Sequence, residues 1–137
     1  MKIMGLDYGD ARTGVAISDL LCTLVGSTTV LPSRNPEKLM ADLVRLTKEN
    51  QIGEIVVGLP KNMDGTEGSR AQLCREFAQT LKDATGLPVA MWDERRTTVE
   101  AHQILSDHNY HGKKRKNTVD AVAASLILEG YLAYRRR

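Results

Sequence analysis

The sequence predicts a mixed α/β fold in which one five-stranded sheet carries helices on both faces. Two observations lead to this prediction. Three strand-like segments follow one another within the first 31 residues, and such tight connections are typical of antiparallel neighbours. Helical and strand-like segments then alternate, which is typical of strands that are joined by covering helices. The expected order is β-β-β-α-β-α-β-α-α.

The first three expected strands differ in how clearly their ends are marked. Residues 2–8 form a short apolar run that ends in a turn-like composition, Asp-Tyr-Gly-Asp. Residues 13–18 and 21–31 are rich in Val, Thr, Ile and Leu, and Asp19 separates them. We therefore expect two tight connections and three antiparallel strands.

A helix and a buried strand are expected next. Asn35 is a helix cap and Pro36 occupies the first helical position. Leucines at helical spacing then continue to about Asn50. The β-branched residues 55–57 are typical of a strand that is buried on both faces. A polar loop is expected over residues 60–69.

The second half of the chain predicts three more helices and one strand. Apolar residues at helical spacing predict a helix that Gly86 ends, and residues 89–92 form the last strand. A Thr-x-x-Glu capping box opens a helix over residues 97–105. Residues 107–117 are expected to form a polar, basic loop, and residues 119–131 the final amphipathic helix.

Composition indicates one globular domain over residues 1–137. Apolar residues make up 42% of the chain and charged residues 26%, which excludes collagen, a disordered chain and a disulfide scaffold. Cys22 and Cys74 lack the spacing of a zinc or redox motif. No apolar run approaches the roughly 20 residues of a membrane helix, so a cytoplasmic protein is expected.

The positive charge is concentrated near the end of the chain. Residues 1–89 carry 10 basic and 11 acidic side chains, whereas residues 90–137 carry 9 basic and 6 acidic ones. Residues 113–116 and 135–137 form two basic blocks, and such blocks suggest contact with a polyanion. The alternative is a solvated loop and a basic tail, and charge alone favours it.

Several acids follow the expected strands. Asp7 closes the first strand, Asp93 and Glu94 close the last, and Asp120 is expected in the first turn of the final helix. Functional groups gather at the carboxyl ends of strands in such sheets. Converging carboxylates suit Mg²⁺, and two such ions can hold a phosphodiester. Each acid taken alone could equally cap a turn, pair with a neighbouring arginine or satisfy helix amides, but the combination favours a site.

Two glycine-containing turns offer donors for phosphate. In residues 7–14, Arg12 could clamp a phosphate through its bidentate fork. In residues 58–66, Lys61 and Asn62 offer further donors. Glycine and proline at these positions also serve plain loop geometry.

Four segments together resemble one family, the YqgF/RuvX group. Residues 5–14 look like its opening motif, residues 56–66 like its second, residues 93–101 like its third and residues 119–124 like its last. The resemblance therefore covers essentially the whole chain. The family is described as Holliday-junction resolvases or as nucleases that trim the precursor of small-subunit ribosomal RNA. It implies a ribonuclease-H-like fold.

The resemblance also implies that Asp7, Glu94 and Asp120 are the catalytic acids and that they bind Mg²⁺ or Mn²⁺. Glu94 is preferred to Asp93; in a strand only one of two neighbouring residues can point at the site. The related resolvase RuvC has two acids in its last helix, three residues apart. Here Asn117 stands three residues before Asp120, which departs from that pattern.

The expected activity is metal-dependent hydrolysis of structured nucleic acid, with the small-subunit ribosomal RNA precursor favoured over a four-way DNA junction. The alternatives are a Holliday-junction resolvase, a non-catalytic RNA- or ribosome-binding factor, and a nucleotide-binding phosphotransferase. A homodimer would suit a symmetric junction. The residues expected to contact nucleic acid are Arg12, Lys61, Asn62, Arg95, Lys113, Lys114, Arg115 and Lys116.

Overall fold

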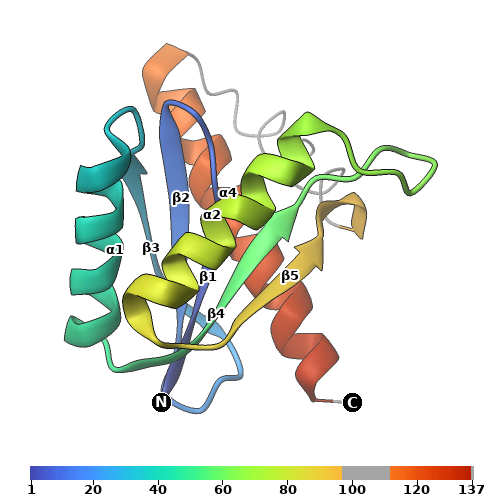
Figure 1. Cartoon of the computed structure of the whole chain (residues 1–137). Coiled ribbons are helices and arrows are strands. Elements are labelled where there is room, and N and C mark those ends of the chain that lie inside the picture. The colour runs from blue at the N-terminus through green and yellow to red at the C-terminus, as the bar shows by residue number, and fades with distance from the viewer. Residues whose placement is uncertain (97–111, 137) are drawn as a thin grey trace.

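The computed structural model describes residues 1–96 and 112–136 (Figure 1). The strands are β1 (Lys2–Asp7), β2 (Arg12–Ser18), β3 (Val25–Pro32), β4 (Ile52–Leu59) and β5 (Val89–Asp93). The helices are α1 (Pro36–Glu49), α2 (Ser69–Thr85) and α4 (Gly112–Arg135), with a short 3₁₀ helix, η1 (Glu94–Arg96), after β5.

The strands form one mixed sheet in the order β3-β2-β1-β4-β5. β2 is antiparallel to both β1 and β3, whereas β4 is parallel to both β1 and β5. This arrangement confirms the predicted fold class. It brings the carboxyl ends of β1, β4 and β5 to the same edge of the sheet.

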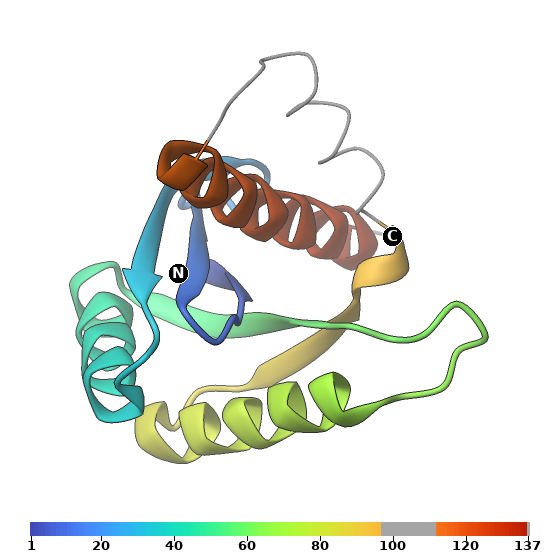
Figure 2. The same ribbon diagram turned by 90° about the horizontal axis from the view of Figure 1, so that it is seen from above.

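Helices cover both faces of the sheet (Figures 1 and 2). Side chains of a strand alternate between faces, and β1 follows this rule. Met4 and Leu6 belong to the core cluster under α1 and α2, whereas Ile3 packs with α4 residues such as Leu128. The two layers therefore share one sheet and have separate cores.

Glycines let α4 lie close to the sheet. A Cβ atom on Gly14 would lie 2.0 Å from the carbonyl oxygen of Asp120, and one on Gly5 would lie 2.9 Å from the Cβ of Leu128. Real side chains do not tolerate such contacts, so both positions need a residue without a side chain. Gly14 thereby brings the backbone at Asp120 directly against β2.

Local signals at the ends of two helices behave as predicted. The Oδ1 of Asn35 accepts a hydrogen bond from the backbone N–H of Lys38 at 3.1 Å, which caps α1. Gly86 has a left-handed φ of 71°, and its N–H donates to the carbonyl of Lys82 at 2.8 Å, which ends α2.

Two predicted boundaries are wrong. The third strand begins at Val25 instead of residue 21, because the Asp19 carboxylate accepts from the N–H and hydroxyl of Thr23 at 2.8 Å and folds the tip into a turn. The last helix begins at Gly112, so residues 113–116 lie in helix, not in a loop. Lys and Arg are good helix formers, but they give no hydrophobic periodicity. The predicted helix over residues 97–105 and residues 107–111 lie outside the described residues.

None of the described helices is both long and apolar enough to cross a membrane.

Candidate active site

Asp7 and Glu94 meet at the edge of the sheet where β1, β4 and β5 end. Asp7 is the last residue of β1, and Glu94 is the first residue of η1, directly after β5. Their half-buried carboxyl groups are hydrogen-bonded to each other. The structure thus brings together two of the three acids that the sequence singles out.

A glycine in the intervening strand lets this contact form. β4 lies between β1 and β5, and a Cβ on Gly58 would lie 2.8 Å from the Oε1 of Glu94. The Glu94 side chain therefore reaches across β4 toward β1. Sequence reasoning treated Gly58 only as part of a turn, although a glycine at the end of a buried strand is a recognised sign of close approach.

Both acids hold their protons more strongly than ordinary carboxyl groups. Burial, the charge of Asp7 and the hydrogen bond to Asp7 raise the pKa of Glu94 to about 8. Burial is also the largest cause that raises the pKa of Asp7, and the charge of Asp120 adds to it, while the hydrogen bond with Glu94 opposes it. Two carboxyl groups this close titrate as a pair. Near neutral pH the pair therefore shares a proton.

Asp120, the third predicted acid, sits differently from the prediction. α4 begins at Gly112, eight positions earlier, so Asp120 is not in the first turn and gains nothing from the helix terminus. Instead, its Oδ2 accepts a hydrogen bond from the Nε of Arg12 at 2.9 Å. Arg12 was predicted to clamp phosphate, and here it neutralises Asp120.

The donor set suits a divalent cation in part. Within residues 1–96 and 112–136, no three His, Cys, Asp or Glu side chains are gathered closely enough to hold a metal. The oxygens of Asp7 and Glu94 nevertheless fit such an ion, because hard cations take carboxylate ligands and would replace the shared proton. The charge of Asp120 acts on Asp7, but its Oδ2 is engaged by Arg12.

Asp93 and Glu94 have opposite surroundings. The carboxylate of Asp93 accepts hydrogen bonds from the side chain of Arg95, with Nη2 and Oδ2 2.6 Å apart. The Arg95 side chain is the largest cause that lowers the pKa of Asp93, whereas that of Glu94 is raised. The structure therefore gives the two neighbours different surroundings, since Asp93 ends β5 and Glu94 begins η1.

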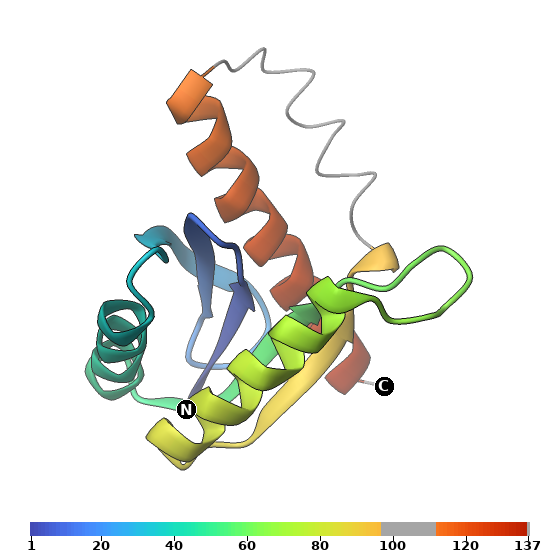
Figure 3. The same ribbon diagram turned by 45° about the horizontal axis from the view of Figure 1, so that its top comes forward.

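The loop between β4 and α2 borders the acids and projects from the molecule (Figure 3). The Nδ2 of Asn62 donates to the hydroxyl of Thr66 at 2.9 Å, so this predicted phosphate donor is engaged within its own loop. The Nη1 of Arg95 donates to the carbonyl of Met63 at 3.4 Å, which ties the loop to η1. Lys61 is near enough to help lower the pKa of Asp93.

Arg70 also reaches this edge, and sequence reasoning missed it. It lies in the first turn of α2, and its guanidinium donates to the Oδ1 of Asp10 at 2.8 Å and to the carbonyl of Tyr8. Its charge helps lower the pKa of both Asp7 and Glu94. A cation in the first turn opposes the helix dipole, and this is the sequence signal that could have drawn attention to it.

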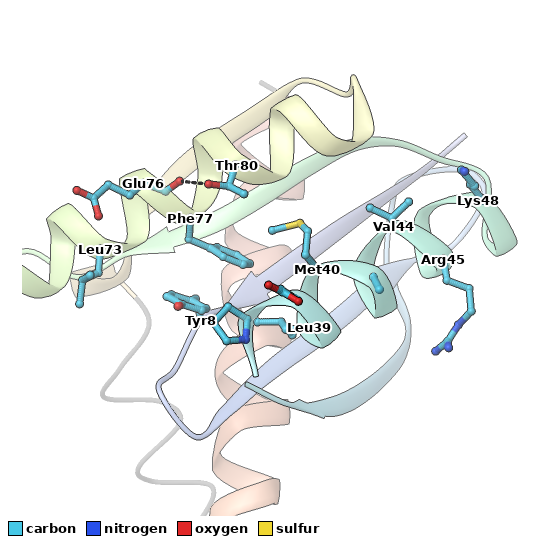
Figure 4. Close-up of a pocket in the computed structure, with 13 residues that line it drawn as sticks. Tyr8, Leu39, Met40, Val44, Arg45, Lys48, Leu73, Glu76, Phe77 and Thr80 are labelled. Atoms are coloured by element: carbon cyan, nitrogen blue, oxygen red, sulfur yellow. Dashed lines mark hydrogen bonds between the residues drawn. The ribbon is translucent and has the colours of Figure 1, made fainter. Parts of the chain in front are cut away.

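A cavity of about 940 Å³ lies between α1 and α2 (Figure 4). Its lining is mostly apolar and includes Leu39, Met40 and Phe77, with Tyr8 at one side. None of the three predicted acids lines it. The carboxyl chemistry is therefore confined to the sheet edge.

Comparison with known proteins identifies relatives over the full length. Residues 1–134 match the family model described as "RuvX: Holliday junction resolvase". A Halothermothrix orenii protein named "Putative pre-16S rRNA nuclease" is 46% identical over 137 residues, covering 100% of this chain and 98% of the relative. A protein of the same name from Desulfitobacterium hafniense strain DCB-2 is 46% identical over 138 residues, covering 100% and 95%.

Solved structures show the same fold at low identity. The Fowlpox virus resolvase in complex with Holliday junction DNA is 9% identical, with a TM-score of 0.66 and 100% of both chains covered. The T. thermophilus RuvC in complex with a Holliday junction substrate is 11% identical, with a TM-score of 0.63 and 99% and 96% covered. These likenesses confirm the predicted ribonuclease-H-like fold.

Proposed function

The chain belongs to the RuvX family, and we propose that it is a divalent-metal-dependent nuclease acting on the precursor of 16S ribosomal RNA. The names of its relatives support this substrate. The observation that carries the chemistry is the proton-sharing pair of Asp7 and Glu94 at the carboxyl ends of the strands.

Asp7 and Glu94 would hold the metal ion, and Asp120, whose Oδ2 is held by Arg12, would complete the set. Nucleases of this resolvase-like family generally use divalent metals, and we propose Mg²⁺ or Mn²⁺. When bound, such an ion activates water for attack on phosphorus and stabilises the leaving oxygen. The pair's raised pKa values mean that the ion must displace a proton, so binding is expected to strengthen as pH rises.

The basic residues around this edge would position the substrate. Lys61 and Arg95 border the acids on the loop and on η1. The residues of the basic block in the first turns of α4 would add affinity that depends on salt, since each bound phosphate releases counterions; they are Lys113, Lys114, Arg115 and Lys116.

Holliday-junction resolution is the second candidate. The family description and the fold shared with junction resolvases favour it. A homodimer would suit the symmetry of a four-way junction, whereas an RNA precursor substrate would bring the protein to assembling ribosomes. A non-catalytic RNA-binding factor would bind without cleaving.

A nuclease assay on the purified protein tests these alternatives. The substrates are a transcript that contains both ends of mature 16S ribosomal RNA and a synthetic four-way DNA junction, each with Mg²⁺, Mn²⁺ or EDTA. We expect metal-dependent cleavage of the transcript that Asp7→Asn removes while RNA binding persists. Asp83→Asn, an exposed site on α2, is the matched control and should cleave normally. Cleavage of the junction alone would favour the resolvase, and RNA binding that needs neither metal nor Asp7, without cleavage, would favour the binding factor.

A further inference from the structure

We propose that Arg70 binds the phosphate group on which the Asp7–Glu94 pair acts. This inference rests on the proposed function, because it names the residue that receives the substrate's phosphate at that same site. No resemblance of motifs pointed to Arg70. The contacts of Arg70 in the folded protein support this role.

Arg70 is placed beside the acids by two elements that are far apart in sequence. It stands in the first turn of α2, and it donates to the Oδ1 of Asp10 at 2.8 Å and to the carbonyl of Tyr8, both in the turn that follows β1. Tyr8 directly follows Asp7. The guanidinium therefore lies beside the acid pair, at the end of β1.

Two other arginines of this edge, Arg12 and Arg95, are held by less exposed partners. Arg12 pairs with Asp120 and Arg95 with Asp93, and those two aspartate side chains are only 20% and 19% exposed. The partner of Arg70 is Asp10, whose side chain is 86% exposed. An ion pair that exposed stabilises little in water. A substrate phosphate can therefore replace Asp10 on Arg70 more easily than it can displace the other two aspartates.

Asp10 shows which kind of group this position accepts. Its carboxylate is an oxygen anion that the guanidinium already binds, and a phosphate presents the same chemistry with more oxygens. Arginine matches such anions with two parallel donors. The Arg70–Asp10 contact is thus a local version of the phosphate contact that we infer.

The guanidinium is also held in position from the core. It lies over the ring of Tyr8, 5.2 Å from the ring centroid. That ring stacks on Phe77 with centroids 4.1 Å apart and planes 4° from parallel (Figure 4), and Phe77 is buried. A side chain that is ordered in advance loses less entropy when it binds. Phe77 and Tyr8 therefore support Arg70 at the place where a phosphate would arrive.

Charge explains why a cation is needed there. A phosphodiester that approaches Asp7 and Glu94 meets two acids, and both would repel it once ionised. The charge of Arg70 acts on both acids and helps lower the pKa of each. The same attraction would act on the substrate phosphate.

Three variants test the inference. Arg70→Ala removes the guanidinium, Arg70→Lys keeps the charge without the fork, and Arg75→Ala is the control. Arg75 lies on the same helix but pairs with Glu67, with Nε and Oε1 2.6 Å apart. Binding of a fluorescein-labelled fragment of the 16S precursor is measured by anisotropy in EDTA over a range of salt concentrations. Cleavage is measured under single-turnover conditions with Mg²⁺.

We expect the plot of log K against log salt to be less steep for Arg70→Ala, by about 0.7 to 0.9, which is the contribution of one bound phosphate. Its cleavage rate should fall roughly 10- to 100-fold, as expected when a charged hydrogen-bond donor is removed. Arg70→Lys should be intermediate in rate and should keep the slope, and Arg75→Ala should match the wild type. Millimolar guanidinium should restore part of the rate of Arg70→Ala, because it replaces the missing group; a purely structural role would show no such rescue.

The outcomes separate this inference from the proposed function. If the wild type cleaves and Arg70→Ala keeps both its rate and its salt slope, the inference is wrong and the nuclease assignment stands. If the wild type binds RNA with a slope that depends on Arg70 but never cleaves, the nuclease assignment is wrong and the phosphate contact stands. A wild type that neither binds nor cleaves overturns both. If Arg70→Ala fails to fold, Arg70→Lys decides: a wild-type rate overturns the inference, and a reduced rate with a wild-type slope supports it.

Discussion

The two faces of the sheet are packed in different ways. Toward α4, glycines replace side chains: Gly14 makes room for the backbone at Asp120, and Gly58 makes room for Glu94. Toward α1 and α2, large side chains such as Leu43 and Phe77 fill the interface and still leave a cavity of about 940 Å³. The acids thus lie at the closely packed face, and the cavity, which is open to solvent between α1 and α2, lies on the other face. The acids are therefore positioned from the α4 face, whereas side chains buried deep under α1 and α2, such as Leu43, are expected to affect stability alone.

Glu94→Gln gives the largest expected effect on cleavage. The variant removes a charged oxygen ligand but keeps the shape of the side chain. Cleavage should fall roughly a hundredfold or more, as when a group that stabilises transition-state charge is removed. Circular dichroism should stay near wild type, and so should thermal melting at about pH 5, where folded Glu94 is still protonated. Asp93→Asn is the matched control, and loss of activity there with activity retained in Glu94→Gln would show that the wrong neighbour was assigned.

Neutralising the basic block in the first turns of α4 should come next in size. Replacing all of residues 113–116 by glutamine is expected to weaken RNA binding. The plot of log K against log salt should also become less steep, by about 0.7 to 0.9 for each phosphate that the block no longer binds. The control replaces Lys38 and Lys48, which are exposed on α1. Equal salt slopes for the two variants would mean that the block is only a solvated helix end.

Leu43→Ala tests the opposite face. Leu43 is fully buried in the core under α1 and α2, so truncation should cost about 2–5 kcal/mol of unfolding free energy. The cleavage rate of the folded fraction should not change, because Leu43 is remote from the acids. Urea denaturation measures the first quantity and single-turnover kinetics the second. A slower rate in the fully folded variant would contradict the separation of the two faces.

The structural features that could be predicted from the sequence are those that depend on local signals. The cap at Asn35 and the turn at Gly86 that ends α2 both depend on neighbouring residues, and the structure contains them. The family motifs located Asp7 and Glu94, which the structure places in contact.

The parts that the sequence did not predict depend on distant contacts. Arg12 and Asp120 are 108 positions apart, so their ion pair could not be read from either segment. The early start of α4 was hidden because its first residues are charged and have no apolar period. Arg70 contacts the turn after β1 only in the folded protein, so neither segment alone reveals its position.

The acid pair predicts how the stability of the metal-free protein depends on pH. The pKa of Glu94 is about 8 in the folded protein, above its ordinary value of 4.5, and that of Asp7 is raised too. Between about pH 5 and pH 8 the folded state therefore binds more protons than the unfolded state, so stability should fall as pH rises. Carboxyl groups with lowered pKa values, such as Asp93, have the opposite effect, but only below about pH 4.5, where they take up protons.

Denaturation in EDTA at several pH values tests whether stability falls as pH rises. Glu94→Gln should flatten the decline, because the amide cannot ionise and the contribution of the raised Glu94 pKa is lost. Stability that rises from pH 5 to pH 8 in the wild type would contradict the pair as the structure shows it. Asp93→Asn should leave the slope above pH 5 unchanged, since Asp93 is already ionised there in both states.

Asp120→Asn should have the smallest effect on the free energy of unfolding, and the sign of this change shows which of two opposing interactions is stronger. The Asp120 charge raises the pKa of Asp7, so its removal relieves repulsion. It also leaves Arg12, whose Nε lies 2.9 Å from the Oδ2 of Asp120, without an anionic partner. The direct, partly buried contact outweighs repulsion with a more distant acid, because Coulomb energies decline with distance. We therefore expect a loss of about 1 kcal/mol in metal-free unfolding free energy, close to that of one hydrogen bond. Added Mg²⁺ or Mn²⁺ should raise the melting temperature of the wild type by binding the native state, and less so that of the variant. A metal-free variant that melts above the wild type would show that repulsion dominates and that Arg12 contributes little at this face.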